Sequence, residues 1–472
     1  MKKILLLIFC LFIFSGCDKE KDELIMATEA GFAPYEYYSN GEVVGVDIDI
    51  AKRIAEYLNK KLVIKDVAFD SIISEVKTGK SDLGVAGISY TDERAREVDF
   101  TIDYVSSRQV VIVNKYSYIN SISDIDNIKV AVQLGSVADS YLTEEYPNIE
   151  IVREKKFLAA IEDLKDYKVD AVIMDELPAK KLVTDDMRIL NESLFTDNYG
   201  IIVKKGNTEL LNAINHVILD MKENGEIDNS LLSHMGMGDE VRSNKTFIDK
   251  IYNSIIYEGR YKYILEGLKN TLLIALGAVI LGIIFGTIFA ISRNIYENTG
   301  KLRILNFISK TYVTIIRGTP STLQLMIIYY VIFKNTSINI VLVGIMAFGI
   351  NSGAYVAEII RAGINSIDKG QWEAGYSLGL TYSKVMRKII LPQSIKNILP
   401  ALGNEFITLV KETSIGAYIG IIELTKASDI IASRTYDYFF PLILIAIIYL
   451  IITMFLSKLI SIMERGLNNA RN

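Results

Sequence analysis

Few side chains in this 472-residue chain are suited to catalysis or to metal binding. Its cysteines are Cys10 and Cys17, and its histidines are His216 and His234. Because Cys10 lies inside an apolar N-terminal segment, no disulfide is expected within a mature chain, and thiol catalysis and cysteine-type zinc sites are excluded. Two histidines also disfavour histidine-based triads and histidine-rich metal sites. We therefore expect a protein that is not an enzyme and that uses no cofactor.

Other residues are suited to binding a ligand that carries both a carboxylate and an ammonium group. Arg94 offers a planar fork for bidentate binding of a carboxylate. Gly87 and Ser89 lie just past a predicted strand, where backbone N–H groups and a hydroxyl could complete the carboxylate pocket. Asp175, at the end of a predicted strand in the second half of the same region, could neutralise the ammonium. Such a cleft must satisfy every polar group that it buries.

The remaining part of such a ligand, its side chain, could be held by aromatic residues. Phe32 and Phe69 could sandwich it, and Glu29 could contact its polar tip. Each candidate also has a simpler interpretation. An arginine after Thr-Asp-Glu, as at position 94, is commonly a surface helix residue, and single phenylalanines are commonly core residues.

The elements that position these residues are short apolar runs alternating with amphipathic stretches from about Leu24 to Leu232. The pattern predicts a helix from Asp47 to Leu58 and several strands. This alternation indicates an α/β fold with parallel sheets covered by helices, whose ligands bind beyond the carboxyl ends of the strands. The predicted strands are 24–27, 83–88, 129–133 and 171–174.

Five segments of this region, in order, resemble the solute-binding proteins that bind polar amino acids. They are Ala27 to Tyr35, Val44 to Asp49, Ala86 to Arg94, Val98 to Phe100 and Val169 to Asp175. The resemblance implies a two-lobed receptor of the periplasmic-binding-protein type. It implies that Gln133 and Ser136 line the second lobe, and that the ligand is a free amino acid. Glutamine, arginine and lysine all fit a carboxylate beside an aromatic sandwich.

The charge of the chain is divided unevenly. The formal net charge is −5, and this near-balance argues against a nucleic-acid binder. From Tyr263 to the end there are 19 basic and 11 acidic residues, a surplus of +8, so the preceding part carries −13. Mean hydropathy is +0.27, too high for an ordinary soluble protein. The sequence therefore contains an acidic part and a basic, apolar part with different surroundings.

The N-terminus has the pattern of an export signal. Lys2 and Lys3 precede an uncharged run to Cys17, which is too short to span a bilayer comfortably. The small residues before Cys17 resemble a bacterial lipoprotein signal, which implies that Cys17 is lipidated. An ordinary signal peptide or an uncleaved anchor remains the alternative. We expect a signal peptide at 1–17, an extracytoplasmic binding domain at 18–240, a linker at 241–262 and a membrane domain at 263–472.

The basic part contains five predicted transmembrane spans. Four are uncharged runs of 16 to 23 residues, and the fifth is apolar but carries Lys396, Glu405, Lys411 and Glu412. If the acidic part lies outside, the inner connections hold eleven basic residues and the outer ones hold three, which predicts an outer N-terminus and an inner C-terminus. The spans are 270–292, 318–333, 335–357, 395–422 and 438–457.

A motif in the second inner connection resembles the coupling loop of bacterial import permeases of the ATP-binding-cassette class. It consists of Glu373-Ala374-Gly375, then Gly379, then Ile389-x-Leu391-Pro392. The predicted loop covers about 370–392, with a short exposed helix from Trp372 to Leu378 and a turn at Gly379. The resemblance implies a cytoplasmic ATPase dimer that grips this helix. For Glu373 alone, a solvated helix charge is the simpler interpretation.

These features together predict a fused receptor and permease of an ATP-driven amino-acid importer, paired with a second copy or a related permease. ATP hydrolysis is expected from a separate subunit, since Thr78-Gly79-Lys80-Ser81 lacks the earlier glycine of a phosphate-binding loop. The location implied is a bacterial cytoplasmic membrane, with contacts to membrane lipid and none to nucleic acid. The alternatives are a ligand-gated ion channel and a sensory receptor with an amino-acid-binding ectodomain.

Overall fold

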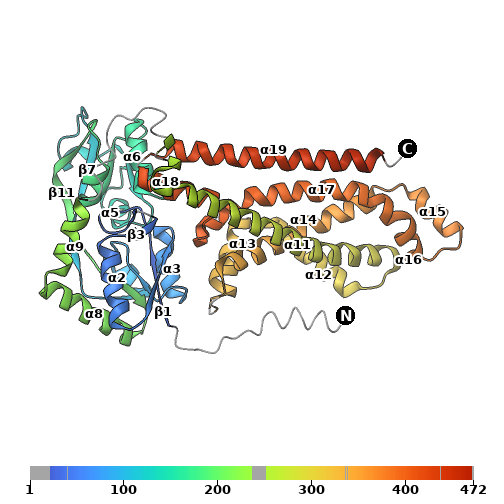
Figure 1. Cartoon of the computed structure of the whole chain (residues 1–472), viewed down its shortest axis with the longest axis horizontal. Coiled ribbons are helices and arrows are strands. Elements are labelled where there is room, and N and C mark those ends of the chain that lie inside the picture. Colours follow the sequence, from blue (N-terminus) through green and yellow to red (C-terminus); the bar gives the residue numbers. More distant parts are fainter. Residues whose placement is uncertain are drawn as a thin grey trace.

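The computed structural model describes residues 22–39, 41–236, 251–252, 254–334, 336, 338–435 and 437–469. The predicted signal peptide at 1–17, including Cys17, lies outside the described residues, as does the first part of the predicted linker at 241–262. The described chain forms an α/β domain followed by a bundle of long helices (Figure 1). The predicted fold class is therefore confirmed.

The first lobe is built on a five-stranded sheet in the order β4-β1-β5-β12-β6. Strands β4, β1 and β5 are parallel, as expected, whereas β12 pairs antiparallel with both β5 and β6 and returns from late in the chain. Helices α2, α3, α8 and α9 belong to this lobe. The bounds are β1 Glu23–Thr28, α2 Val46–Tyr57, β4 Lys61–Asp66, α3 Ile72–Lys77, β5 Leu83–Gly84, α4 Asp92–Glu97, β6 Val98–Phe100, β12 Ile202–Lys204, α8 Thr208–Glu223 and α9 Glu226–Met235, with a small hairpin of β2 Tyr37–Ser39 and β3 Glu42–Val44.

The second lobe has a five-stranded sheet in the order β11-β7-β10-β8-β9. Its two longest strands, β7 and β11, pair antiparallel along most of their length, and Val105 and Tyr199 pair where the chain enters and leaves the lobe. The strand predicted at 129–133 has these bounds, the one predicted at 171–174 extends one residue further to Asp175, and β9 was not predicted. The bounds are β7 Val105–Asn114, β8 Lys129–Gln133, α5 Val137–Glu145, β9 Glu150–Glu154, α6 Phe157–Lys165, β10 Ala171–Asp175, α7 Glu176–Leu182 and β11 Met187–Tyr199.

Two glycines show why local sequence produces these turns. Gly45 precedes α2 with φ +135, and a Cβ there would lie 2.0 Å from the carbonyl oxygen of Tyr35. Only glycine allows this close approach of the two backbone segments. The strand predicted at 83–88 is shorter in the structure, and a glycine with positive φ again marks the turn that follows it. It ends at Gly84, and Gly87 then adopts φ +52 and turns its N–H toward Asp47.

The helical part contains three helices long and apolar enough to cross a membrane, in the portion of the chain that the structure describes. They are α11 Tyr261–Thr299, α14 Ile340–Asn365 and α19 Phe439–Asn469. Shorter helices lie between them. Their bounds are α12 Arg303–Gly318, α13 Ser321–Ile327, η5 Ile328–Ile332, α15 Lys369–Ser377, α16 Tyr382–Val385, η6 Met386–Ile390, α17 Leu391–Glu412, η7 Thr413–Ile419 and α18 Leu424–Thr435.

One predicted connection in the bundle is helical. The sequence placed Lys310 and Arg317 in an inner connection and began the second span at Gly318. In the structure both residues lie on α12, and the guanidinium of Arg317 lies 5.5 Å from the centre of the Tyr355 ring. The helix accommodates these charged residues because their long side chains can lie along neighbouring aromatic surface. It ends at Gly318, where the second span was predicted to begin, and α13 starts at Ser321.

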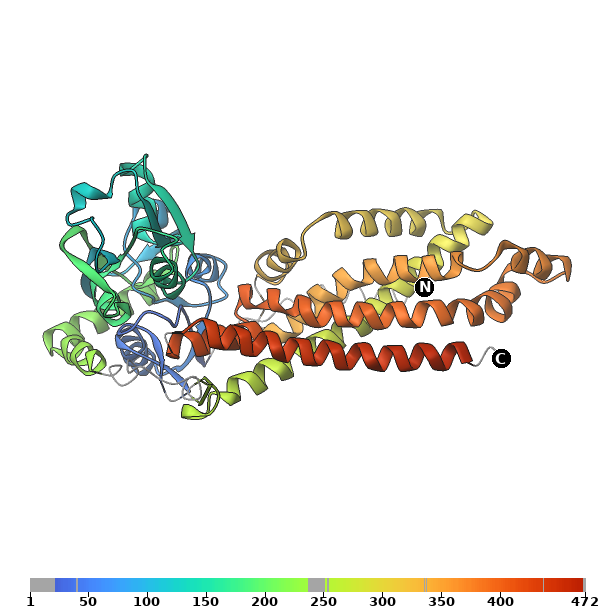
Figure 2. The ribbon, with the colours of Figure 1, turned by 90° about the horizontal axis from the view of Figure 1, so that it is seen from above.

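The α/β domain rests on one end of the helical bundle, and α15 lies at the opposite end (Figures 1 and 2). Both lobes contact the bundle. In the first lobe, Lys80 donates hydrogen bonds to the backbone carbonyl of Phe333 and, at 3.5 Å, to that of Thr336. In the second lobe, the Lys155 ammonium lies 3.6 Å from the centre of the Tyr418 ring.

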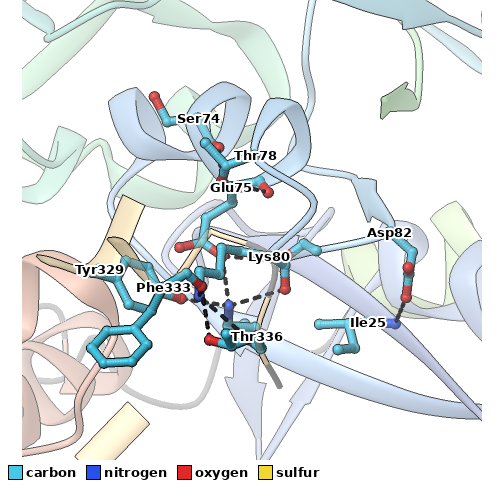
Figure 3. A network of polar contacts seen from close by, with 11 residues as sticks. Ile25, Ser74, Glu75, Thr78, Lys80, Asp82, Tyr329, Phe333 and Thr336 are labelled. Carbon is cyan, nitrogen blue, oxygen red and sulfur yellow. Dashed lines mark hydrogen bonds and ion pairs between the residues drawn. The ribbon is translucent and has the colours of Figure 1, made fainter. Parts of the chain in front are cut away.

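The contact at Lys80 is a network of polar groups from both parts of the chain (Figure 3). The Lys65 ammonium donates to Glu75 and to the hydroxyl of Tyr329, at 2.5 and 2.9 Å. The Lys80 ammonium lies 4.7 Å from the centre of the same Tyr329 ring. The turn at Gly79, with φ +71, directs the chain from α3 into this contact. The segment that resembled a phosphate-binding loop is thus a contact between domain and bundle.

Candidate functional site

A cleft between the two lobes brings most of the predicted ligand-binding residues together. About 330 Å³ of space, part of it open to solvent, lies between its lining residues. Eight of the nine predicted residues line it, and Arg94 does not. The lining residues are Glu29, Phe32, Glu36, Phe69, Ala86, Gly87, Ser89, Gln133, Ser136, Val137, Phe157 and Asp175.

Arg94 lies beside the cleft and bridges the lobes. It sits in the first turn of α4, where the Thr91 hydroxyl accepts a hydrogen bond from its backbone N–H at 3.2 Å. Its guanidinium donates to the carbonyl oxygens of Ser89, at 2.6 Å, and Gly135, at 2.8 Å. Burial lowers the pKa of Arg94 to about 10, so it stays charged at neutral pH. A guanidinium has five N–H groups, and a ligand carboxylate could take those not used here.

Gly87 and Ser89 are in position, but their polar groups already have partners. The Gly87 N–H donates to the carboxylate of Asp47 at 3.0 Å, and the Ser89 hydroxyl donates to Asp197. The N–H expected to complete a carboxylate pocket is therefore directed away from the cleft. The carbonyl of Gly87 remains as an acceptor for an ammonium group.

The acidic end of the cleft contains more carboxylates than the sequence indicated. Asp175 ends β10 and accepts hydrogen bonds from Gln109, at 2.7 Å, and from Tyr199. Burial and the neighbouring Asp197 raise the pKa of Asp175. Glu36 lines the same end and is 1% exposed; burial and Asp47 raise its pKa well above the usual range. Burial also raises the pKa of Asp47 to about 6.

The aromatic part of the site differs from the predicted pair. Phe32 and Phe69 both line the cleft, but Phe32 stacks on Phe157, with ring centroids 5.6 Å apart. Phe69 lies beneath Arg94, whose guanidinium is 5.8 Å from the ring centre. Phe157 was missed because it is an apolar residue at the start of an amphipathic helix, where a core position is the ordinary interpretation.

Glu29 also lines the cleft and has a cationic neighbour that the sequence did not indicate. Its carboxylate is 3.0 Å from the ammonium of Lys156, and the two side chains are 4% and 13% exposed. Lys156 precedes α6 in the second lobe. No spacing rule connects residues 127 positions apart, so only the closed arrangement of the lobes reveals this ion pair.

The two residues expected from the second lobe are present. Gln133 ends β8 and donates from its amide to the Lys155 carbonyl at 3.1 Å. Ser136 caps α5 by accepting from the N–H of Asp139 at 3.2 Å. Both line the cleft opposite the first lobe. Among the residues that the structure describes, no group of three or more histidine, cysteine or acidic side chains could hold a metal ion.

The predicted coupling loop forms an exposed helix at the far end of the bundle (Figure 1). This is α15, in which Glu373 and Ala374 are exposed. Gly379 follows with φ +71, the predicted turn. Gly375 is buried, and a Cβ there would lie 2.8 Å from the Val385 side chain, which explains a glycine at this position.

Comparisons with known proteins divide the chain at the same place. Residues 24–237 match a family described as bacterial extracellular solute-binding proteins, family 3. Residues 278–469 match a family described as binding-protein-dependent transport system inner membrane component. Both families are transport proteins and not enzymes.

Individual relatives match the helical half over nearly their whole length. A putative glutamine transport system permease protein GlnP of Rickettsia prowazekii is 40% identical over 211 residues, which cover 44% of this chain and 94% of the relative. The arginine transport system permease protein ArtQ of Bacillus subtilis is 39% identical over 209 residues, or 44% and 93%. Among solved structures, the substrate-binding protein AbpA from Streptococcus pneumoniae bound to L-arginine is 33% identical, covering 46% of this chain and 97% of that chain with a TM-score of 0.45.

Proposed function

Because the chain belongs to the family of binding-protein-dependent transport system inner membrane components and carries a solute-binding domain in front, we propose that it is the receptor and permease subunit of an ATP-driven amino-acid importer. It is an inner membrane protein. The cleft captures a free amino acid outside the cell, and the helical half passes it across the membrane.

The observation that supports this function is the distribution of charge along the cleft. One end has Asp175 and Glu36, which suit an ammonium group, and Arg94 stands beside it for a carboxylate. Glu29 lines the same cleft together with Phe32, Phe69 and Phe157, and its carboxylate suits a polar or cationic side-chain tip. A ligand with three such groups satisfies buried charges that would otherwise be costly.

The two ends of the bundle support the direction of transport that we propose. The acidic receptor lies at one end and α15 at the other (Figure 1). With the receptor outside, α15 faces the cytoplasm, where Glu373 and its exposed neighbours bind a separate ATPase dimer. A second copy of this chain or a related permease completes the pathway, since one bundle of this class cannot enclose it. Cys17 is lipidated and anchors the mature N-terminus at the outer surface.

Calorimetry of the full chain in nanodiscs against the twenty amino acids tests this function. We expect binding of glutamine, arginine or lysine in the micromolar range or tighter and no binding of amino acids with acidic side chains. Failure of every amino acid to bind would refute the proposal. Ligand-induced currents without an ATPase would support the channel alternative instead.

The variant Glu373→Ala tests the coupling end. Glu373 is exposed and far from the cleft, so ligand affinity should stay within twofold of the wild type. Stimulation of ATP hydrolysis by ligand, measured with the partner ATPase, should fall at least tenfold, because the helix loses the side chain that enters the ATPase groove. Lys369→Ala, on the same helix, serves as the matched control. Unchanged stimulation in Glu373→Ala would contradict the coupling role.

A further inference from the structure

Five charged residues meet where both lobes contact the bundle. Glu29 and Asp66 come from the first lobe, Lys156 comes from the second, and Lys426 and Asp429 come from α18 of the membrane half. We call these five residues the three-part cluster. One of its members, Glu29, lines the ligand cleft.

Asp66 joins the membrane half to the ligand site. The Lys426 ammonium lies 2.9 Å from its carboxylate, and the two side chains are 4% and 8% exposed. The same carboxylate accepts from the N–H of Ala30 at 3.1 Å and from the Tyr38 hydroxyl at 3.0 Å. Ala30 is the neighbour of Glu29 in the chain. A charge on Lys426 is therefore buried close to the end of the cleft that holds a side-chain tip.

Lys156 is the second cation of the three-part cluster. Burial alone would lower its pKa, but the carboxylates of Glu29, Asp66 and Asp429 raise it, so Lys156 remains charged. Three carboxylates then share two ammonium groups. Within the cluster the carboxylates therefore exceed the ammonium groups by one, and Glu29 brings one of these carboxylates to the cleft.

Such a cluster favours a cationic ligand tip, and Lys426 weakens that preference. Without Lys426, Asp66 would add its full negative charge to the potential around Glu29. With Lys426 in place, that charge is neutralised at 2.9 Å. In a buried site the interaction of two charges several ångströms apart is worth enough to change affinity by roughly tenfold.

We propose that Lys426, a residue of the permease half, is a positioning residue of the receptor's ligand site; this inference rests on the proposed function. By neutralising Asp66, Lys426 lowers the affinity of the site for amino acids with cationic side chains. Contact with the membrane half thereby promotes release of a cationic substrate where the pathway begins. The neutralisation of Asp66 does not alter the affinity for an uncharged substrate of the same shape. The substrate class that the carboxylates of the cluster favour is still an amino acid with a cationic tip.

The test uses the full chain in nanodiscs and two ligands, arginine and citrulline, which has nearly the same shape and an uncharged tip. In Lys426→Met we expect the Kd for arginine to fall about tenfold and that for citrulline to stay within about twofold, as the loss of one buried cation predicts. Lys426→Arg keeps the charge and should retain the wild-type ratio of the two Kd values.

Lys80→Met provides the matched control. Lys80 also joins receptor and bundle, through the carbonyls of Phe333 and Thr336, but it lies outside the three-part cluster (Figure 3). Loss of Lys80 should change both affinities by a similar factor. If Lys80→Met raises the ratio of arginine to citrulline affinity as much as Lys426→Met does, the effect comes from loss of contact between receptor and bundle, and the proposal is wrong.

The remaining outcomes are equally informative. An unchanged ratio of arginine to citrulline affinity in Lys426→Met would overturn the role of Lys426. A wild-type chain that binds glutamine but not arginine would overturn the cationic substrate class while leaving the proposed function standing. A wild-type chain that binds no amino acid would refute the proposed function itself.

Discussion

The ligand cleft and the contact between receptor and bundle both bury charged side chains, but they treat them differently. Glu36, in the cleft, and Asp47, behind it and bonded to Gly87, are 1% and 0% exposed, and each has an oxygen without a hydrogen-bond partner. In the contact, Asp66 is paired with Lys426, and Lys80 reaches two backbone carbonyls. A buried charge is tolerated when it is paired, and otherwise its pKa shifts.

This difference distinguishes a surface whose charges mostly have ion-pair partners from one whose charges lack them. The contact pairs most of its buried charges, although the three-part cluster has one carboxylate more than it has ammonium groups. The acidic end of the cleft is left with raised pKa values at Glu36, Asp47 and Asp175, whose chief cause is burial. A cleft of this kind is poised to bind a cation, and the ammonium of an amino acid is such a cation.

The largest effect should come from Arg94→Ala. Arg94 is the cation beside the cleft, and it also bridges Ser89 and Gly135 across the lobes. Its loss should weaken amino-acid binding by more than about 100-fold, because charge-assisted bonds to a carboxylate are among the strongest in proteins. Calorimetry of the full chain measures this.

Arg108→Ala is the matched control for that variant. Arg108 is half-exposed and pairs with Glu176 at 2.6 Å, outside the cleft. It should keep wild-type affinity. Retained micromolar affinity in Arg94→Ala would show that Arg94 does not bind the ligand carboxylate. The acidic side chains of the cleft would then have no cationic residue opposite them in the binding of the amino acid.

The sequence predicted this site well where a motif is local. Eight of nine predicted residues line the cleft, and the ninth, Arg94, lies beside it. The residues that were missed, among them Glu36, Phe157 and Lys156, act through partners distant in the chain. Glu36 is a single glutamate after Pro-Tyr and carries no spacing signal of its own. Its position one residue beyond the recognised segment from Ala27 to Tyr35 could have suggested it.

The fold was predictable to a similar degree. Strands 129–133 and 171–174 were predicted from their apolar runs, whereas β12 was not, because it pairs with Gly84 more than a hundred residues earlier. In the bundle, the predicted boundary at Gly318 coincides with the end of α12, but the uncharged-run criterion did not show that Arg317 lies on a helix. Length and polarity identify a span, but they do not show where a long charged side chain can be accommodated.

A second variant, Glu29→Gln, tests the part of the cleft at Glu29. It removes the carboxylate that faces the side-chain tip and leaves Lys156 without its partner at 3.0 Å. We expect arginine affinity to fall about 30-fold and citrulline affinity to change by less than about fivefold, since only the former loses a charge pair. Glu42→Gln, in the exposed hairpin, is the control. Equal losses for both ligands would indicate that Glu29 acts through packing.

The pKa shifts of the cleft predict a pH effect. Raised pKa values mean that the empty native state binds more protons than the unfolded state. Glu36, Asp47 and Asp175 therefore stabilise the empty protein more at pH 5 than at pH 8, and the contribution of Asp47 is lost as pH rises through its pKa of about 6. A ligand ammonium favours the ionised carboxylates, so binding should release protons and weaken as pH falls from 7.5 to 5.5.

Calorimetry at pH 6 in buffers with different ionisation enthalpies measures this release. We expect between about 0.3 and 1 proton per ligand, because the affected carboxylates titrate near that pH. Asp47→Asn should reduce the number. A binding enthalpy independent of the buffer would mean that the cleft is already ionised when empty, and the contrast with the paired contact would not hold.

The smallest effect should come from the contact itself, because most of its charges are paired. Lys80 is 9% exposed, and Lys80→Ala removes bonds to the carbonyls of Phe333 and Thr336 near the end of η5 (Figure 3). A lysine at a helix C-terminus contributes about 1 kcal/mol, so amides of the adjoining outer segment should exchange with deuterium about fivefold faster. Lys77→Ala, an exposed neighbour on α3, should leave that segment unchanged. If Lys80→Ala instead abolished amino-acid binding, the contact would be part of the ligand site, and the two surfaces would have to be treated as one.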